Sequence, residues 1–309
     1  MKLQAFILLT GLFVVGAMAS LHAATPQSPI RLWPNGAPNE TGSFGPEHDT
    51  QTSADKLVGG KTVEKITDVT VPTITFYPAP VGNTGATVVV FPGGAYRILA
   101  MDLEGTEVCQ WLNSIGVNAV LLKYRVPMRP GLSRYAPPLQ DAQRALGIVR
   151  SHATDWHINP HRIGVLGFSA GGHLAAVISD NYEKRTYQQV DLADSTSCRP
   201  DFALLIYPAY LTEGDHGTQL APELPVTAKT PPTFLVQTED DPVHVENSLV
   251  YYRALKDAHV PAEMHIYSEG HHGYGLRPTA FPVTRWPTLA QEWLHTIGMI
   301  GNTASTKEQ

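Results

Sequence analysis

The pentapeptide at residues 167–171 constrains the fold more than any other stretch of this chain. It reads Gly-Phe-Ser-Ala-Gly, and the G-x-S-x-G spacing is typical of a sharp turn that exposes a serine between a strand and a helix. Residues 162–166 before it have the pattern of a short buried strand, and residues 172–178 after it are small and apolar, as at a helix start. A side chain in place of either glycine would collide across so tight a turn. The pattern therefore predicts that Ser169 is held out as a nucleophile.

The remaining sequence alternates short strands with helices. Further strands are predicted over residues 65–71, 73–77, 86–91, 118–124, 202–207, 233–238 and 263–267, and helices over residues 105–114, 141–151, 247–258 and 287–297. Buried strands that alternate with helices predict an α/β fold, with a mostly parallel central sheet and helices on both of its faces. A chain of 309 residues with 43% hydrophobic residues can bury one large core, which favours one domain over two.

The N-terminal residues 1–24 have the pattern of a secretory signal peptide. Lys2 precedes an apolar run over residues 5–17, and small residues at 17–19 or 23–24 offer cleavage sites. The alternative is an uncleaved membrane anchor, but the run is shorter than the roughly 20 apolar residues that a spanning helix needs. We therefore expect a secreted or periplasmic protein with no stable membrane insertion after signal removal.

The mature chain divides into three predicted parts. Residues 25–60 are rich in Pro, Gly and polar residues and read as an extended arm anchored by Leu32 and Trp33, residues 61–300 form the catalytic domain, and residues 301–309 form a flexible tail. Two proline-bearing polar segments, residues 181–200 and 209–232, interrupt the alternation of strands and helices. Long irregular connections in a compact domain are often functional, so both are predicted to form the cap or rim of a substrate cleft.

Charge and cysteine usage exclude several partners. The formal net charge is -6, which becomes -7 when Lys2 leaves with the signal peptide, and no cluster of Lys and Arg is present, so nucleic acid is not an expected partner. Cys109 and Cys198 allow one disulfide, but Cys109 lies on the apolar side of a predicted helix, which favours two buried thiols. Neither C-x-x-C nor H-E-x-x-H occurs, so neither a metal site nor another cofactor is predicted.

A base for Ser169 is found in the glycine-rich loop at residues 269–275. A serine hydroxyl needs a base to take its proton and an acid to orient that base. The loop follows the last predicted strand and carries His271 and His272. The Gly-Tyr-Gly sequence that comes directly after His272 favours it over His271 as the base.

The orienting acid is predicted in the loop after the strand at residues 233–238. Glu239, Asp240 and Asp241 follow one another there, in the chain order of serine, acid and histidine that this arrangement uses. The spacing to the next helix favours Asp240 as the acid. Asp241 would then brace the loop or the helix entry, and Glu239 would be solvated.

Two backbone N–H groups are needed for the oxyanion of a tetrahedral intermediate. One belongs to Ala170, the residue after the nucleophile. The other is predicted in the turn at residues 93–95, with Gly94 and Ala95 as the donors, because a glycine turn after a buried strand can aim its amides at the site.

These motifs resemble those of the α/β-hydrolases of the esterase and lipase superfamily. Within it, the chain is similar to the secreted acetyl-esterase and acetylxylan or feruloyl esterase-like branch. The resemblance covers almost the whole mature chain and rests on residues 91–96, 122–125, 141–145, 159–164, 167–171, 238–241, 246–249 and 270–276. Two positions depart from the branch pattern: Ala95 stands where a third glycine is usual, and His271 stands where a glycine often precedes the histidine.

The resemblance implies an α/β-hydrolase fold with small cap insertions. It also implies a serine carboxylic-ester hydrolase that needs no metal and acts on short acyl esters, often acetyl groups of plant polysaccharides or oligosaccharides. The expected partner is a small-molecule or oligosaccharide ester. Two alternatives are a serine peptidase of the same fold and a catalytically silent binding protein. The chain has no room for the large extra domain of many such peptidases, and all three triad residue types are present.

Overall fold

The computed structural model describes residues 25–80, 82–214 and 217–301. The predicted signal peptide and residues 302–309 of the predicted tail lie outside them. The central sheet has eight strands in the order β1 (Ile30–Arg31), β4 (Thr73–Tyr77), β7 (Asn118–Lys123), β5 (Thr87–Phe91), β8 (Ile163–Phe168), β9 (Ala203–Ile206), β10 (Thr233–Thr238) and β11 (Ala262–Tyr267). The strands from β7 to β11 run parallel, whereas β4 pairs antiparallel with both β1 and β7.

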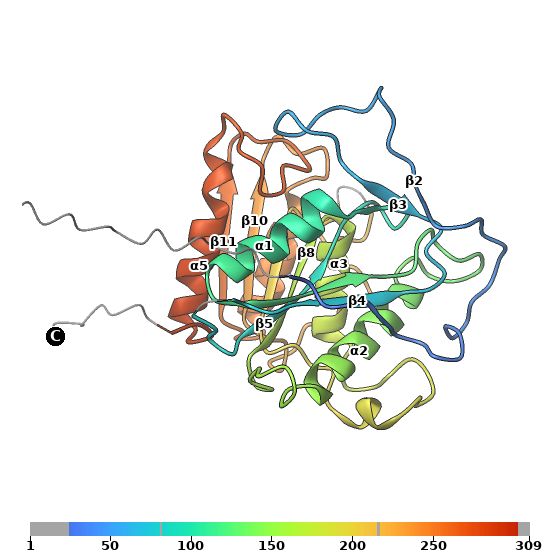
Figure 1. The fold of residues 1–309 in the computed structure, drawn as a ribbon. Coiled ribbons are helices and arrows are strands. Elements are labelled where there is room, and N and C mark those ends of the chain that lie inside the picture. The colour runs from blue at the N-terminus through green and yellow to red at the C-terminus, as the bar shows by residue number, and fades with distance from the viewer. Residues whose placement is uncertain (1–24, 81, 215–216, 302–309) are drawn as a thin grey trace, which may run out of the picture.

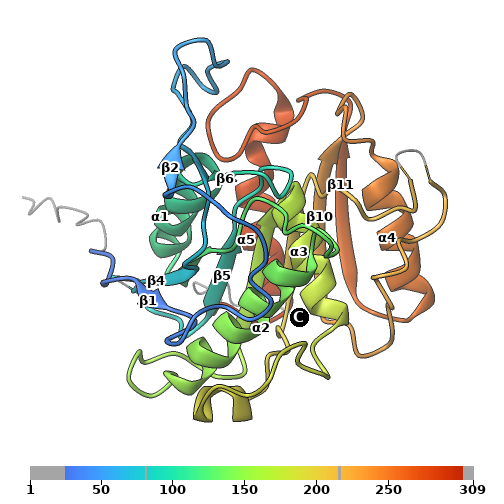
Figure 2. The ribbon, with the colours of Figure 1, turned by 90° about the vertical axis from the view of Figure 1, so that its right-hand side faces the viewer.

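Helices cover both faces of this sheet, which confirms the predicted α/β fold. The helices are α1 (Glu107–Ser114), α2 (Ala136–Ser151), α3 (Ala170–Asp180), α4 (Glu246–Asp257) and α5 (Trp286–Thr296). Figure 1 shows α1 and α5 in front of the sheet, and Figure 2 shows α1 and α4 on opposite sides of it. Alternate residues of β5 enter two separate apolar clusters, Val88 and Val90 with α1 and α5, and Val89 and Phe91 with α2, α3 and α4. This two-sided burial explains why the central strands consist mainly of apolar residues.

The starts of two helices differ from the predicted ones. The helix α2 begins at Ala136, five residues earlier than predicted, and Pro137 and Pro138 occupy its first turn, where a missing N–H costs nothing. A π-helical turn, η1 (Asp102–Thr106), precedes α1. None of the helices in the described ranges is long and apolar enough to cross a membrane.

The arm at residues 25–60 contributes strands to two sheets. Its β1 adds to the edge of the central sheet, and its β2 (His48–Asp49) forms a small sheet with β3 (Lys65–Thr67) and β6 (Leu99–Ala100). Leu32 and Trp33 are buried, as their predicted role as an anchor requires. The Trp33 indole donates to Asp141 Oδ1 at 2.8 Å, and the buried Arg125 donates through Nε to both oxygens of the same carboxylate at 3.0 Å. One buried carboxylate therefore joins the arm, the end of β7 and α2.

The segment at residues 181–200 packs against α2, and this corrects the expectation that it lines the substrate cleft. It contains the short helix η2 (Leu192–Ser195). Arg144 of α2 lies 3.0 Å from Asp194 Oδ1 through Nη1 and donates to both oxygens of Asp191. The segment is polar because it pairs with a charged residue of α2. Amino-acid composition alone does not distinguish such a structural role from a role in substrate binding.

The two cysteines are free and buried, which confirms the expectation of two thiols. Burial raises the pKa of both, so neither thiol is activated as a nucleophile.

A partly buried carboxyl at the end of α3 predicts a pH dependence of stability. Asp180 accepts hydrogen bonds from Thr230 Oγ1 at 2.6 Å and from the Tyr251 hydroxyl at 3.0 Å, and burial raises its pKa from 3.8 to about 6. A raised pKa in the folded protein means that the group's stabilising contribution is complete below pH 3.8 and is lost as the pH rises through about 6. The Asp180→Asn variant is therefore expected to gain stability relative to the parent protein between pH 4 and pH 7, by up to about 3 kcal/mol. Thermal unfolding of both proteins at pH 4 and at pH 7 measures this gain. The prediction is contradicted if the stability of Asp180→Asn relative to the parent protein does not increase from pH 4 to pH 7.

Candidate active site

Ser169 lies in a strained turn between β8 and α3. Its backbone φ of 50° and ψ of -116° place it outside the conformations that non-glycine residues favour. A Cβ atom on Gly167 would lie 1.9 Å from the carbonyl oxygen of Gly171, which is the predicted collision across the turn. A Cβ atom on Gly171 would instead lie 2.1 Å from the carbonyl oxygen of Phe91 in β5. The second glycine is thus required because the start of α3 packs directly on the neighbouring strand.

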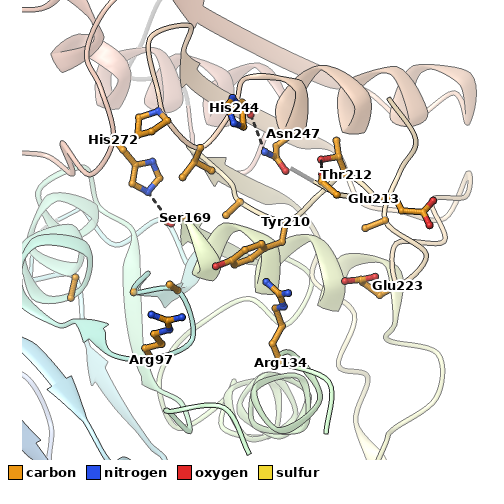
Figure 3. Close-up of a pocket in the computed structure, with 18 of the residues that line it drawn as sticks. Arg97, Arg134, Ser169, Tyr210, Thr212, Glu213, Glu223, His244, Asn247 and His272 are labelled. Atoms are coloured by element: carbon orange, nitrogen blue, oxygen red, sulfur yellow. Dashed lines mark hydrogen bonds between the residues drawn. The ribbon is translucent and has the colours of Figure 1, made fainter. Parts of the chain in front are cut away.

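His272 contacts Ser169, as the sequence predicts. Its Nε2 atom lies 2.9 Å from Ser169 Oγ, and Figure 3 shows this contact at one end of a cavity. Its Nδ1 atom lies 2.8 Å from Asp241 Oδ2, and the Asp241 side chain is fully buried. The histidine comes from the loop after β11 and the aspartate from the loop after β10, so the carboxyl ends of neighbouring parallel strands bring them together.

The structure corrects the predicted acid, because Asp241 and not Asp240 contacts His272. Asp240 accepts hydrogen bonds from the backbone N–H of His271 at 2.8 Å and of Gly270 at 3.2 Å, and it lies 3.0 Å from the His271 ring. It therefore braces the histidine loop, which is the role expected of Asp241. The Asp241 N–H donates to the carbonyl of Thr238, so the chain turns back after β10 and carries this side chain toward the end of the sheet. Because three acidic residues follow one another here, the sequence alone does not indicate which of them the turn directs toward His272.

The turn after β5 exposes the two N–H groups predicted to bind an oxyanion. Gly94 and Ala95 have φ values of 133° and 54°, and a Cβ atom on Gly94 would lie 2.1 Å from the carbonyl oxygen of Ile98. Within the described ranges the N–H groups of these two residues have no acceptor, and both residues line the cavity that contains Ser169. Ala170 opens α3, so its N–H has no partner within the helix. All three predicted donors are thus at the same cavity end as the serine.

Glu104 is a buried residue of this site that the sequence analysis missed. Its Oε2 atom accepts from the Gly93 N–H at 2.7 Å, and its Oε1 atom accepts from the Tyr207 hydroxyl at 2.8 Å. The same hydroxyl accepts from the Gly275 N–H at 3.1 Å. Burial raises the pKa of Glu104, against the lowering effect of these hydrogen bonds. Glu104 thereby connects the turn at Gly93 to the loop that carries His272. No spacing in the sequence marks it, because its two hydrogen-bond partners come from separate segments, near residues 93 and 207.

His173 is a buried residue of α3 that contacts the turn after β5. It lies one turn after Ser169 in α3, and its Nδ1 atom is 2.8 Å from the hydroxyl of Tyr96. Its Nε2 atom is 3.3 Å from Glu223 Oε1 but has no hydrogen bond of good geometry there. Burial lowers the pKa of His173, so the imidazole is favoured in its neutral form. The turn that holds Ala95 is therefore supported from α3 as well as from Glu104.

The serine and histidine open into a cavity of about 900 Å³. Its walls come from the turn after β5, from residues 209–214 and 221–223, and from residues 242–247. The segment at 209–232 thus forms the rim that the sequence predicts. No residue of the segment at 181–200 is among the described residues that line this cavity.

The fold, the strained serine turn and the Ser169–His272–Asp241 contacts define an α/β-hydrolase arrangement. Comparison with known proteins agrees: residues 88–228 match the model of a family described as having the alpha/beta hydrolase fold. The crystal structure of an acetyl ester-xyloside bifunctional hydrolase from Caldicellulosiruptor lactoaceticus is 36% identical in sequence, with a TM-score of 0.70, over 89% of this chain and 97% of that one. The chain belongs to the α/β-hydrolase family.

Two curated relatives have names connected with xylan. An acetylxylan esterase from Xylanibacter ruminicola is 31% identical over 224 residues, which make up 64% of this chain and 42% of the relative. Endo-1,4-beta-xylanase B from Butyrivibrio fibrisolvens is 29% identical over 202 residues, which make up 60% of this chain and 32% of the relative. The chain therefore spans less than half the length of each of these two proteins.

Proposed function

We propose that this protein is a serine carboxylic-ester hydrolase that removes short acyl groups, above all acetyl, from plant polysaccharides or oligosaccharides. The observation that carries the proposal is the continuous line of contacts from Ser169 through His272 to the buried Asp241. The similarity to an acetylxylan esterase and to an acetyl ester-xyloside hydrolase supports the acetyl group and a xylose-containing alcohol.

The reaction proceeds through an acyl-enzyme. Ser169 Oγ attacks the ester carbonyl while His272 Nε2 takes its proton, and Asp241 holds the imidazole in the tautomer that has its proton on Nδ1. The N–H groups of Ala170 and of Gly94 or Ala95 bind the developing oxyanion, and each such donor contributes about 10²–10³ in rate. His272 then protonates the leaving alcohol. Water, activated by the same histidine, releases the acid and restores the serine.

We also propose that residues 1–24 direct export and that the enzyme acts outside the cytoplasm, in the periplasm or the medium. In this proposal the arm at residues 25–60 and the domain at residues 61–300 form the mature catalytic unit. Polymeric xylan cannot enter a cell intact, so export is consistent with the proposed substrate class.

The activity is tested by measuring the acid released by the purified mature protein from three classes of ester. Acetylated xylo-oligosaccharides and short nitrophenyl esters are expected to be hydrolysed faster than feruloyl esters of the same sugars. A fluorophosphonate probe should label Ser169, because the probe reacts only with an activated serine. Faster cleavage of peptide amides than of esters would favour a peptidase, and the absence of both labelling and turnover would favour a silent binding protein.

A further inference from the structure

We propose that Arg97 and Arg134 form a carboxylate-binding subsite at the mouth of the active-site cavity. The preferred substrate is then an ester whose alcohol part carries a carboxylate, such as an acetylated oligosaccharide that bears a uronic acid. This inference rests on the proposed esterase function and specifies its substrate class.

Both arginines line the cavity that contains Ser169 and His272, and both are exposed. Arg97 lies two residues after Ala95, in the turn predicted to bind the oxyanion. Its guanidinium has no hydrogen bond or ion pair with any residue of the described ranges. Arg134 stacks its guanidinium on the Tyr210 ring at 4.3 Å and has no carboxylate within ion-pair distance in the same ranges.

Two buried arginines elsewhere in the domain are held by acidic partners. Arg125 is paired with Asp141, and Arg277 contacts both Asp102 and Glu107. A guanidinium presents a planar fork of donors that matches the two oxygens of a carboxylate. Within the described ranges neither Arg97 nor Arg134 has a carboxylate within ion-pair distance, so the guanidinium donors of both are available to an anionic ligand.

The two arginines differ in their distance from the acidic residues of the cavity, which are Glu104, Glu213 and Glu223. Figure 3 shows Arg97 toward Ser169, and Arg134 beside Tyr210, between Arg97 and Glu223. The carboxylate of Glu223 also lies against the buried His173, at 3.3 Å from its Nε2 atom. The contact with His173 and the charge of Arg134 lower the pKa of Glu223. Arg97 is the arginine on the serine side of the cavity.

The exposure of the two arginines indicates which part of the ester they contact. A short acyl group is held next to Ser169 and the N–H groups of the turn, whereas the alcohol part must extend toward the cavity mouth and leave through it. Arg97 and Arg134 are exposed at that mouth, so a carboxylate on the alcohol part can reach them.

The test compares two small esters with the same acetyl group. In 4-acetoxybenzoate the alcohol part carries a carboxylate, and in 4-acetoxybenzamide it carries a neutral amide. The ratio of kcat/KM for the two esters corrects for any general damage to catalysis. We expect Arg97→Gln and Arg134→Gln each to lower this ratio by about 3- to 10-fold, as for partly exposed ion pairs, mainly through KM. Arg253→Gln is the matched control, because Arg253 is an exposed arginine on α4 outside the cavity, and it should leave the ratio unchanged.

Two further measurements separate the possible outcomes. A third ester, phenyl hydrogen succinate, places the carboxylate on the acyl part, and a loss confined to that substrate would overturn the assignment to the alcohol part. An unchanged ratio in both variants would overturn the subsite itself. Calorimetric binding of 4-hydroxybenzoate and of 4-hydroxybenzamide gives a readout that does not depend on turnover. Weaker binding of the anion to the variants than to the parent protein supports the subsite. If the parent protein binds the anion in this way but hydrolyses no ester, the esterase function is rejected and the subsite is retained.

Discussion

The Asp241→Asn variant is expected to lower kcat for a short acetyl ester by about 10⁴-fold, the loss typical of a triad acid replaced by its amide. The carboxylate of Asp241 is fully buried and accepts from His272 Nδ1, so it favours the tautomer whose Nε2 can take the serine proton. An asparagine of the same shape can present its own N–H to Nδ1 and stabilise the opposite tautomer. Rates of acetate release from nitrophenyl acetate by both proteins measure the effect.

The neighbouring carboxylate is the internal control. Asp240→Asn retains an oxygen that can accept from His271 or Gly270, so we expect a loss of less than about tenfold, together with a slightly lower Tm from the weakened loop. If Asp240→Asn shows the larger loss, His272 is oriented by Asp240 during catalysis and the contact with Asp241 is not the productive one.

The Ser169→Ala variant is expected to lose about 10⁶-fold in kcat while it keeps its fold. The hydroxyl of Ser169 makes one described hydrogen bond, to His272, and its removal leaves no buried group without a partner because His272 is partly exposed. We therefore expect a Tm within a few degrees of the parent value. Ser151→Ala is a suitable control, since Ser151 ends α2 and donates to the carbonyl of Ile148 far from the cavity.

Turnover that persists in Ser169→Ala would require another nucleophile. Complete loss of the folded protein would point to a structural role for the serine that its contacts do not indicate. Circular dichroism and thermal unfolding, measured on the same preparation as the rates, separate the two results.

The central elements of the fold could be predicted because each has a strong local cause. The strands β5 and β8 are almost entirely apolar, and β10 has an apolar centre over residues 234–236; such runs have few alternatives to a buried position in a parallel sheet. The serine turn was equally predictable, because Gly167 and Gly171 leave no room for a side chain. For the strands and for Gly167 the physical requirement is contained within a few consecutive residues, whereas Gly171 is required by the packing of α3 on β5.

The features that could not be predicted depend on contacts between distant segments. The choice between Asp240 and Asp241 is decided by how the turn after β10 meets the loop of His272, about 30 residues further on. Glu104 has partners near residues 93 and 207, and the segment at 181–200 owes its polarity to Arg144 in α2. Composition and spacing report on neighbours in sequence, whereas these roles are set by neighbours in space.

The hydrogen bonds of Glu104 have a consequence for how the enzyme becomes active during folding. Gly93, Glu104, Tyr207 and Gly275 are successive members of one chain of hydrogen bonds, and its links join positions up to 103 residues apart. Contacts between such distant positions form late, because long loops must close first. The last member of this chain, Gly275, follows β11, so the network is complete only when the segment after β11 has docked. A nascent chain that lacks this last segment also lacks His272, and so has neither the complete network nor the base that contacts Ser169.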